Sequence, residues 1–225
     1  SSQVGCSLAC KFCATGKLKL MRNLTAGEMV DQVVYLKNQA ENRYNTPLSN
    51  IVYMGMGEPL LNYNNMLRST ELICSPEGLG MSPKRITVST AGIAKMIRKL
   101  GDDEVKFNLA LSLHAANDKK RSEIMEINDS NNLETLAEAL TYFHSKTGTR
   151  VTFEYIIFRD FNDELEDAEE LVKAIRKIEA KKEMNPGYQL NVLLENFRQA
   201  SDSPKKIVIP SSEGMHIIRV SEILR

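Results

Sequence analysis

The sequence lacks an excess of charge, a long apolar run and a second cysteine cluster, and each absence argues against a class of protein. Because its 29 basic side chains equal its 29 acidic ones, no whole-molecule field would attract nucleic acid, and any RNA contact must be local. No stretch of about 18 apolar residues occurs, which argues against a membrane span. The first residues do not form a signal peptide. Four cysteines, three of them bunched, fit a reducing compartment, so we expect a cytoplasmic protein.

The composition that is present describes a globular chain. A 42% share of hydrophobic residues over 225 positions is typical of one large domain or slightly more. The chain begins at Ser1 rather than at Met, and Cys6 follows five residues later. We therefore expect it to be part of a longer protein.

Three cysteines, Cys6, Cys10 and Cys13, form the strongest motif of the sequence. Thiolates select iron–sulfur clusters, zinc or copper(I) over hard cations. A structural zinc site uses four ligands, but the other candidates, Cys74 and His114, lie far along the chain and outside any paired ligand motif. Three thiolates on a [4Fe–4S] cluster leave one iron open to a small molecule. The spacing favours such a cluster, with zinc, a disulfide or unliganded thiols as the alternatives.

Helix and strand patterns alternate along the chain. A capping box at residues 25–28 begins the first helix, which we expect to reach about residue 39. Such alternation predicts parallel βαβ units that wind into a barrel or an open sheet. The expected strands are 1–5, 50–54, 85–89, 106–113 and 150–158, and the later helices are 63–74, 93–100, 133–145 and 164–177.

Polar loops follow three of the expected strands. They contain Gly57 and Glu58, then Ser89, and then Ser112, Leu113 and His114. Parallel β/α barrels build their active sites at the carboxyl ends of their strands. We therefore expect these loops to share one rim.

The spacing C-x-x-x-C-x-aromatic-C, with Phe12 at the aromatic place, resembles the cluster motif of the radical S-adenosylmethionine (SAM) superfamily. Together with the three polar loops, the Ser-Ser-Gln-Val-Gly sequence at 1–5 and the Arg-Asn-Leu sequence at 22–24, this motif makes residues 1–173 closely resemble the RlmN family of radical SAM methyltransferases. This family methylates adenine C2 in 23S ribosomal RNA and in transfer RNA. The resemblance implies a partial (β/α)6 barrel, truncated at both ends.

The resemblance also implies roles for individual residues. The three cysteines would bind the cluster beside Phe12, Gly57 and Glu58 would bind the SAM amino group, and Ser89 its methionine or ribose end. The segment Ser112, Leu113 and His114 would lie at the nucleoside. Each residue also has a purely structural interpretation: Ser89 and Ser112 could cap helices, Gly57 and Glu58 could form a turn, and His114 could be a hydrogen-bonded structural histidine. Implied partners are rRNA and tRNA, and an electron donor such as flavodoxin or ferredoxin.

The family's chemistry uses two further cysteines, a methyl carrier and a resolving cysteine, and neither has a counterpart in this sequence. We therefore assign no catalytic residue, and we expect the chain to cleave SAM at best. Cys74 matches no family ligand and is expected to be a buried or partly buried thiol. The basic residues Lys11, Lys17, Lys19 and Arg22 either form a solvated face or contact phosphates.

After residue 173 the family pattern stops. We expect a helical linker at 174–200 and the start of a small β domain at 201–225, with a hairpin formed by 206–210 and 215–220. This tail resembles the junction of a LytTR-type response regulator. That resemblance implies DNA as a partner, and the alternative function is then that of a DNA-binding response regulator. A competing interpretation makes 190–196 a sixth barrel strand with Asn196 at SAM. Leucine spacing favours a helix there and a barrel left incomplete.

Overall fold

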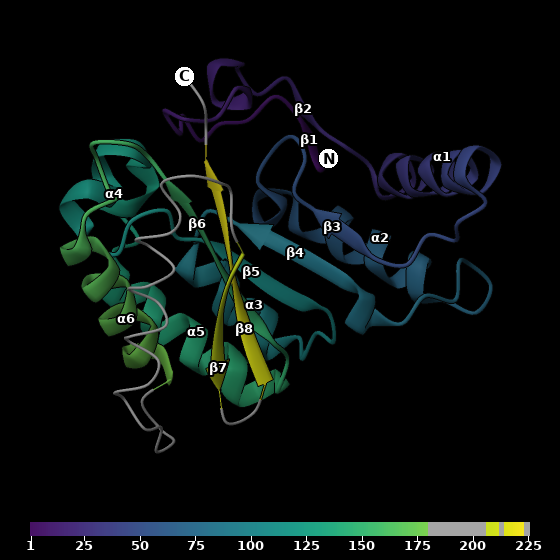
Figure 1. Ribbon diagram of the computed structural model, residues 1–225. Helices are drawn as coiled ribbons and strands as arrows, with labels where there is room; N and C mark the ends of the chain where they lie inside the picture. Colours follow the sequence, from purple (N-terminus) through teal and green to yellow (C-terminus); the bar gives the residue numbers. More distant parts are fainter. Residues whose placement is uncertain (180–205, 212–213, 223–225) are drawn as a thin grey trace. The chain divides into compact units, whose positions relative to one another are not determined.

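The computed structural model describes residues 1–179, 206–211 and 214–222 (Figure 1). Two compact units divide the chain: Ser1–Thr90 with Val105–Leu109, and Ala91–Glu104 with Ala110–Arg225. None of the described helices is both long and apolar enough to cross a membrane.

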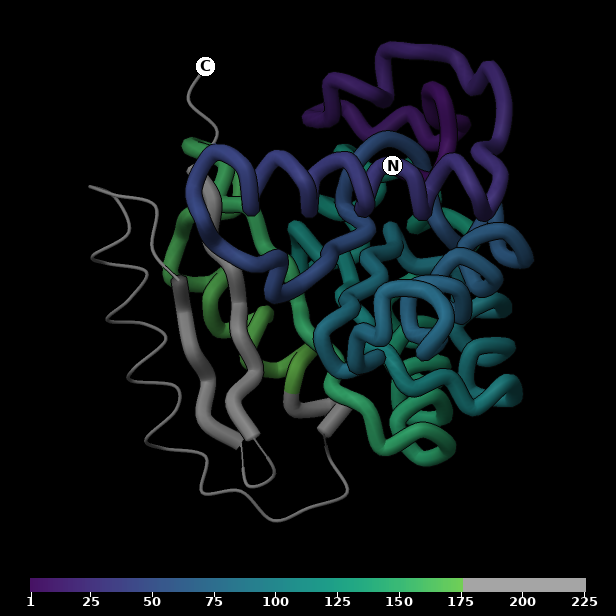
Figure 2. The backbone as a smooth tube through the Cα atoms, turned by 90° about the vertical axis from the view of Figure 1, so that its right-hand side faces the viewer, coloured from purple at the N-terminus to yellow at the C-terminus, as the bar shows by residue number. Residues whose placement is uncertain are grey.

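The first unit begins with a short antiparallel pair, β1 (Gln3–Val4) and β2 (Arg22–Asn23), which flanks the cysteines. The chain then passes directly into α1 (Ala26–Tyr44) and turns back toward the strands (Figure 2). The predicted capping box starts α1, because Thr25 Oγ1 accepts from the Glu28 N–H (3.2 Å) and Glu28 accepts from the Thr25 N–H (2.8 Å). The elements that follow are β3 (Ile51–Tyr53), α2 (Tyr63–Cys74) and β4 (Ile86–Thr90).

The core of this unit lies between the strands and α2. Strands β3 and β4 are parallel, and Tyr53 pairs with Val88. Burial alternates along β3, where Tyr53 is 6% exposed and Val52 is 52% exposed, as expected for a strand with one covered face. The Tyr53 hydroxyl shares a 2.7 Å hydrogen bond with Ser69 of α2, which satisfies a polar group inside the core. Met66 and Ile73 of α2 are fully buried.

Strand β5 (Asn108–Ser112) begins in the first unit and ends in the second. The strand order is β3-β4-β5 in the first unit and β5-β6-β8-β7 in the second. The other elements of the second unit are α3 (Ala94–Asp102), α4 (Asp118–Ile124), α5 (Leu133–Thr147), β6 (Val151–Ile157), α6 (Leu165–Glu179), β7 (Lys206–Ser211) and β8 (Gly214–Glu222). Phe143 of α5 and Phe153 and Tyr155 of β6 form part of its buried core.

Most of the predicted elements are confirmed. Helix α2 has the predicted bounds, and the other predicted helices differ from the observed ones by a few residues. The expected strand at 1–5 is corrected: β1 pairs antiparallel with β2 in a sheet of its own, because its partner is the segment that returns after the cysteines. Four parallel strands rather than five therefore precede residue 158. Sequence analysis also missed the short, charged helix α4.

The tail beyond α6 supplies the last two strands. The predicted hairpin is confirmed, because β7 and β8 pair antiparallel around residues 212–213. Strand β8 also pairs parallel with β6, from Glu154↔Arg219 to Ile157↔Glu222, so the hairpin covers the edge that β6 would otherwise expose. The described strands form an open sheet rather than a closed barrel, as predicted. The boundary at residue 173 stays a prediction, and the helix or strand at 190–196, with Asn196, lies outside the described residues.

Candidate functional site

The cysteine loop lies between β1 and β2 in the first unit. Cys6, Cys10 and Cys13 are each partly exposed, and no disulfide joins them. Successive turns wind the loop, since the Cys13 N–H donates to the Cys10 carbonyl (3.1 Å) and the Gly16 N–H donates to the Cys13 carbonyl (3.0 Å). A Cβ at Gly16 would lie 2.6 Å from the Cys10 carbonyl oxygen, so this turn requires glycine.

The surroundings of Cys6 combine burial with two backbone donors. Burial raises the pKa of its thiol, and the negative charges of Glu58 and Cys13 act in the same direction. The Leu8 N–H, 3.4 Å from Cys6 Sγ, and the Ser7 N–H oppose them by stabilising the thiolate. Bound positive iron would offset the first two effects, because a coordinating thiol is deprotonated outright.

The donor set of the loop fits a thiolate-bound iron–sulfur cluster, since three thiols lie on one segment without disulfides. Their positions do not yet form a closed site. Among the residues that the structure describes, no three His, Cys, Asp or Glu side chains gather closely enough to hold a metal ion. The assignment of Cys6, Cys10 and Cys13 as cluster ligands therefore stays a prediction.

The loop after β3 packs against β1. The Ser2 and Gln3 N–H groups both donate to the Met56 carbonyl, at 2.9 and 3.2 Å. Gln3, only 2% exposed, accepts from the Glu58 N–H through Oε1 (2.9 Å). Gly57 has φ +91°, and a Cβ there would lie 2.4 Å from Gln3 Cβ. The structure thus brings Gly57 and Glu58 beside the strand that leads into the cysteine loop.

Glu58 is a buried acid that ends this loop. Its side chain is 3% exposed and caps the short 3-10 turn Pro59–Asn62 by accepting from the Leu60 N–H (3.1 Å). Ser89, 8% exposed, lies in β4 just beyond the residue that pairs with Tyr53. Because β3 and β4 are parallel, the Glu58 loop and Ser89 occupy the same end of the two strands.

The third predicted segment lies in the second unit, at the end of β5. Here Ser112 is partly exposed, while Leu113 and His114 are buried. His114 has φ +57°, a left-handed conformation that is uncommon for a residue with a side chain. Its ring Nδ1 accepts from the Ile156 N–H (3.3 Å). Burial lowers its pKa to about 3, and the charge of Arg121 adds to this effect.

The predicted site residues therefore fall into two groups. In the first unit, Gly57, Glu58 and Ser89 lie at one end of β3 and β4, and the loop of Gly57 and Glu58 is hydrogen-bonded to β1, which leads into the cysteine loop. The segment Ser112 to His114 lies in the second unit. That all of them line one SAM pocket stays a prediction. Sequence analysis assigned no role to three buried polar residues near these loops: Gln3, Arg121 and Asn162. Residues of these types usually lie at the surface, and no sequence spacing identifies the ones that are buried.

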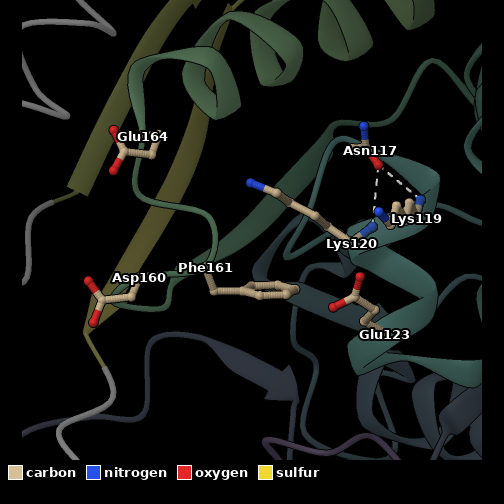
Figure 3. Close-up of a pocket in the computed structure, with 7 residues that line it drawn as sticks. All are labelled: Asn117, Lys119, Lys120, Glu123, Asp160, Phe161 and Glu164. Atoms are coloured by element: carbon tan, nitrogen blue, oxygen red, sulfur yellow. Dashed lines mark hydrogen bonds between the residues drawn. The ribbon is translucent and has the colours of Figure 1, made fainter.

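A cavity of about 570 Å³ lies elsewhere in the second unit (Figure 3). Basic, acidic and uncharged side chains line it: Asn117, Lys119, Lys120, Glu123, Asp160, Phe161 and Glu164. Lys120 extends its ammonium group across the cavity (Figure 3). This group forms an ion pair with Asp167 (2.5 Å) and lies 5.9 Å from the centre of the Phe161 ring. No predicted site residue lines this cavity, and its acidic side chains disfavour a phosphate.

Comparisons with known proteins identify relatives. A family model described as the radical SAM superfamily matches residues 1–175. The chain is 58% identical over 181 residues to the probable dual-specificity RNA methyltransferase RlmN of Christiangramia forsetii, covering 80% of this chain and 51% of that protein. It is 48% identical over 219 residues to the protein of the same name from Flavobacterium psychrophilum, covering 97% of this chain and 62% of that protein. A solved radical SAM methyltransferase from Sphaerobacter thermophilus matches with TM-score 0.78 and 35% identity, covering 99% of this chain and 64% of the other.

The chain spans about half to three fifths of the length of these curated relatives. The predicted LytTR-type junction is not borne out, because similarity to an RlmN protein covers 97% of the chain. The structure gives the physical reason, since β8 of the tail pairs with β6 in the same sheet. The chain belongs to the radical SAM superfamily, and its resemblance to the RlmN family is confirmed.

Proposed function

We propose that this chain is the SAM-cleaving core of an RlmN-type RNA methyltransferase that acts on adenine C2 of 23S rRNA and tRNA. The observation that supports this most strongly is the cysteine loop next to the Gly57 and Glu58 loop, in a chain 58% identical to an RlmN protein. Radical SAM proteins in general use SAM and a [4Fe–4S] cluster. When bound, the cluster supplies one electron that divides SAM into methionine and a 5′-deoxyadenosyl radical.

In this proposal the residues of the chain bind and orient. Cys6, Cys10 and Cys13 hold three irons, beside Phe12. Gly57 and Glu58 hold the SAM amino group, for which a buried carboxylate is a suitable acceptor. The tight contact between Gly57 and Gln3 holds this loop against the strand that leads into the cysteines.

The remaining roles belong to the strand ends. Ser89 binds the methionine or ribose end of SAM, and Ser112, Leu113 and His114 contact the nucleoside. The electron comes from a donor such as flavodoxin or ferredoxin, in a reducing compartment such as the cytoplasm. RNA contact is local: Lys11, Lys17 and Lys19 are exposed, and residues 1–27 contain no acidic side chain, so this segment can face phosphates.

The test is anaerobic reconstitution of the chain with iron and sulfide. We expect labile sulfide, a brown protein absorbing at about 400 nm, and 5′-deoxyadenosine after addition of SAM and a reductant. Replacement of the three cysteines with alanine should abolish all three signals. One zinc per chain without labile sulfide after reconstitution would contradict the proposal.

A further inference from the structure

The backbone after β5 is held by two buried side chains. Arg121, fully buried, donates from Nη2 to the carbonyl of Ser112 (3.2 Å) and from Nε to that of Leu113 (3.1 Å). Asn162, also fully buried, donates from Nδ2 to the carbonyl of His114 (2.7 Å). Three successive carbonyl oxygens are therefore bound by side chains from other parts of the same unit.

The same two side chains also bind the ends of neighbouring segments. Arg121 Nη2 donates to the carbonyl of Ala91, just after β4, at 2.6 Å. Asn162 donates to the carbonyl of Ile156 (2.9 Å) and accepts from the Phe158 N–H (2.6 Å). Such satisfied buried networks make a backbone rigid. The segment after β5 is thus fixed relative to the segment after β4 and the end of β6.

The network leaves His114 in a single chemical state. Its N–H donates to the carbonyl of Glu154 (3.2 Å), which fixes the left-handed backbone that would otherwise be strained. Its ring Nδ1 accepts from the Ile156 N–H, so Nδ1 carries no proton. In a neutral imidazole one nitrogen accepts and the other donates, so the proton is on Nε2.

We propose that Asn162 and Arg121 are positioning residues that fix the segment Ser112–His114, with His114 as a neutral imidazole protonated on Nε2, in the conformation that binds the SAM nucleoside. The identity of the ligand rests on the proposed function, whereas the clamp rests on the contacts above. A fixed segment matters for recognition, because a binding segment that is already ordered loses less conformational freedom when the ligand binds. A purely structural role for Asn162 would stabilise the fold without controlling the ring of His114.

The first test reads the ring directly. We would record nitrogen-15 spectra of the histidine rings as a function of pH, assigned with a His114→Ala variant. The wild type should show one tautomer, with the proton on Nε2, that persists well below pH 6.5. Asn162→Asp keeps the acceptor for Phe158 but loses both donors, and it should give mixed tautomers. Because the new carboxylate by itself raises the pKa of the ring, only the tautomer is compared in this variant.

Two further variants make this test decisive. Leu140→Ala removes a fully buried side chain of α5 in the same unit and should lower stability without changing the ring of His114. Arg121→Lys keeps the charge but offers fewer directed donors, and it should shift the His114 signals even if Asn162→Asp does not fold. An unchanged tautomer in both the Asn162 and the Arg121 variants would overturn the proposal.

The second test reads the ligand by calorimetric titration of SAM into anaerobically reconstituted protein. We expect Asn162→Asp to weaken binding about tenfold, the loss typical of one buried hydrogen bond. In a His114→Ala background the same change should cost nothing further, and Leu140→Ala should bind as the wild type does. Equal losses in both backgrounds would overturn the positioning role. A wild type that shows the clamped ring but binds no SAM would refute the proposed function and leave the clamp standing.

Discussion

The cysteine loop and the segment after β5 are organised in opposite ways. The cysteines are partly exposed, and within the described structure they do not gather into a metal site. Ser112–His114, by contrast, has each of its carbonyl oxygens bound by a buried side chain. The first region has a recognisable sequence motif, but its cysteine side chains are not brought together. The second region has a less specific motif, but its backbone is fixed by hydrogen bonds. The protein itself therefore fixes the second region, whereas in our proposal a bound cluster would organise the first.

The largest expected effect is a loss of bound iron without a matching loss of folding stability. Replacing Cys6, Cys10 and Cys13 together with alanine should remove all bound iron, because no other described group can replace three thiolates. The apo protein should change its free energy of unfolding by less than about 1 kcal/mol, since partly exposed side chains contribute little. Iron analysis and urea unfolding measure the two quantities. A variant that loses its fold along with its iron would show that the cysteines stabilise the apo structure.

Arg121 should give the opposite result. Arg121→Met leaves the carbonyl groups of Ala91, Ser112 and Leu113 without their buried donor and should lower the free energy of unfolding by about 3 to 5 kcal/mol. Arg98→Gln is the control, because Arg98 forms an exposed ion pair with Glu138 that should contribute less than about 1 kcal/mol. Similar losses in the two variants would mean that burial of Arg121 has no special role.

His114 should make the second region sensitive to acid. Its folded-state pKa of about 3 lies below the ordinary value of 6.5, so the unfolded chain binds more protons between these pH values. Stability is therefore fully present above pH 6.5 and falls with decreasing pH, by up to about 1.4 kcal/mol per pH unit from this group. His114→Gln should remove this slope from the difference between the two unfolding curves. Parallel curves from pH 7 to 4 would contradict a buried neutral His114.

The smallest expected effect tests the contact between β1 and the loop after β3. Gly57→Ala would place a Cβ 2.4 Å from Gln3 Cβ and should cost about 2 kcal/mol of stability. Gly80→Ala is its control, because Gly80 also has positive φ (+59°) but has no atom within 4 Å of a built Cβ, and only the backbone cost of about 1 kcal/mol remains. Thermal unfolding of both variants measures the difference. Equal losses would show that crowding against Gln3 is unimportant.

Sequence patterns predicted what depends on periodicity and spacing. Helix α2 follows from its apolar repeat, and the start of α1 follows from Thr25 and Glu28. The pairing of β1 with β2 could not be predicted, because two-residue strands have no period and their partner is set by the loop between them. Helix α4 is short and charged, and so it has no apolar stripe.

Buried polar residues were the main omission in the site. Arg121 lies among charged residues of α4, where a solvated position is the ordinary expectation. Asn162 lies in a loop whose sequence, Asp-Phe-Asn-Asp, is typical of an exposed turn. Only the fold shows that both are fully buried and directed at backbone carbonyls. Their roles depend on contacts between segments far apart in the chain.

Amide hydrogen exchange before and after anaerobic reconstitution tests the contrast most directly. We predict that the cluster protects the amides of residues 6–18, which exchange rapidly in the apo protein. The amides of Leu113, His114 and Ile156 should be protected in both forms, because Glu154 and the His114 ring already bind them. Equal protection of the cysteine loop with and without the cluster, or rapid exchange at Leu113 and Ile156 in the apo protein, would contradict the account.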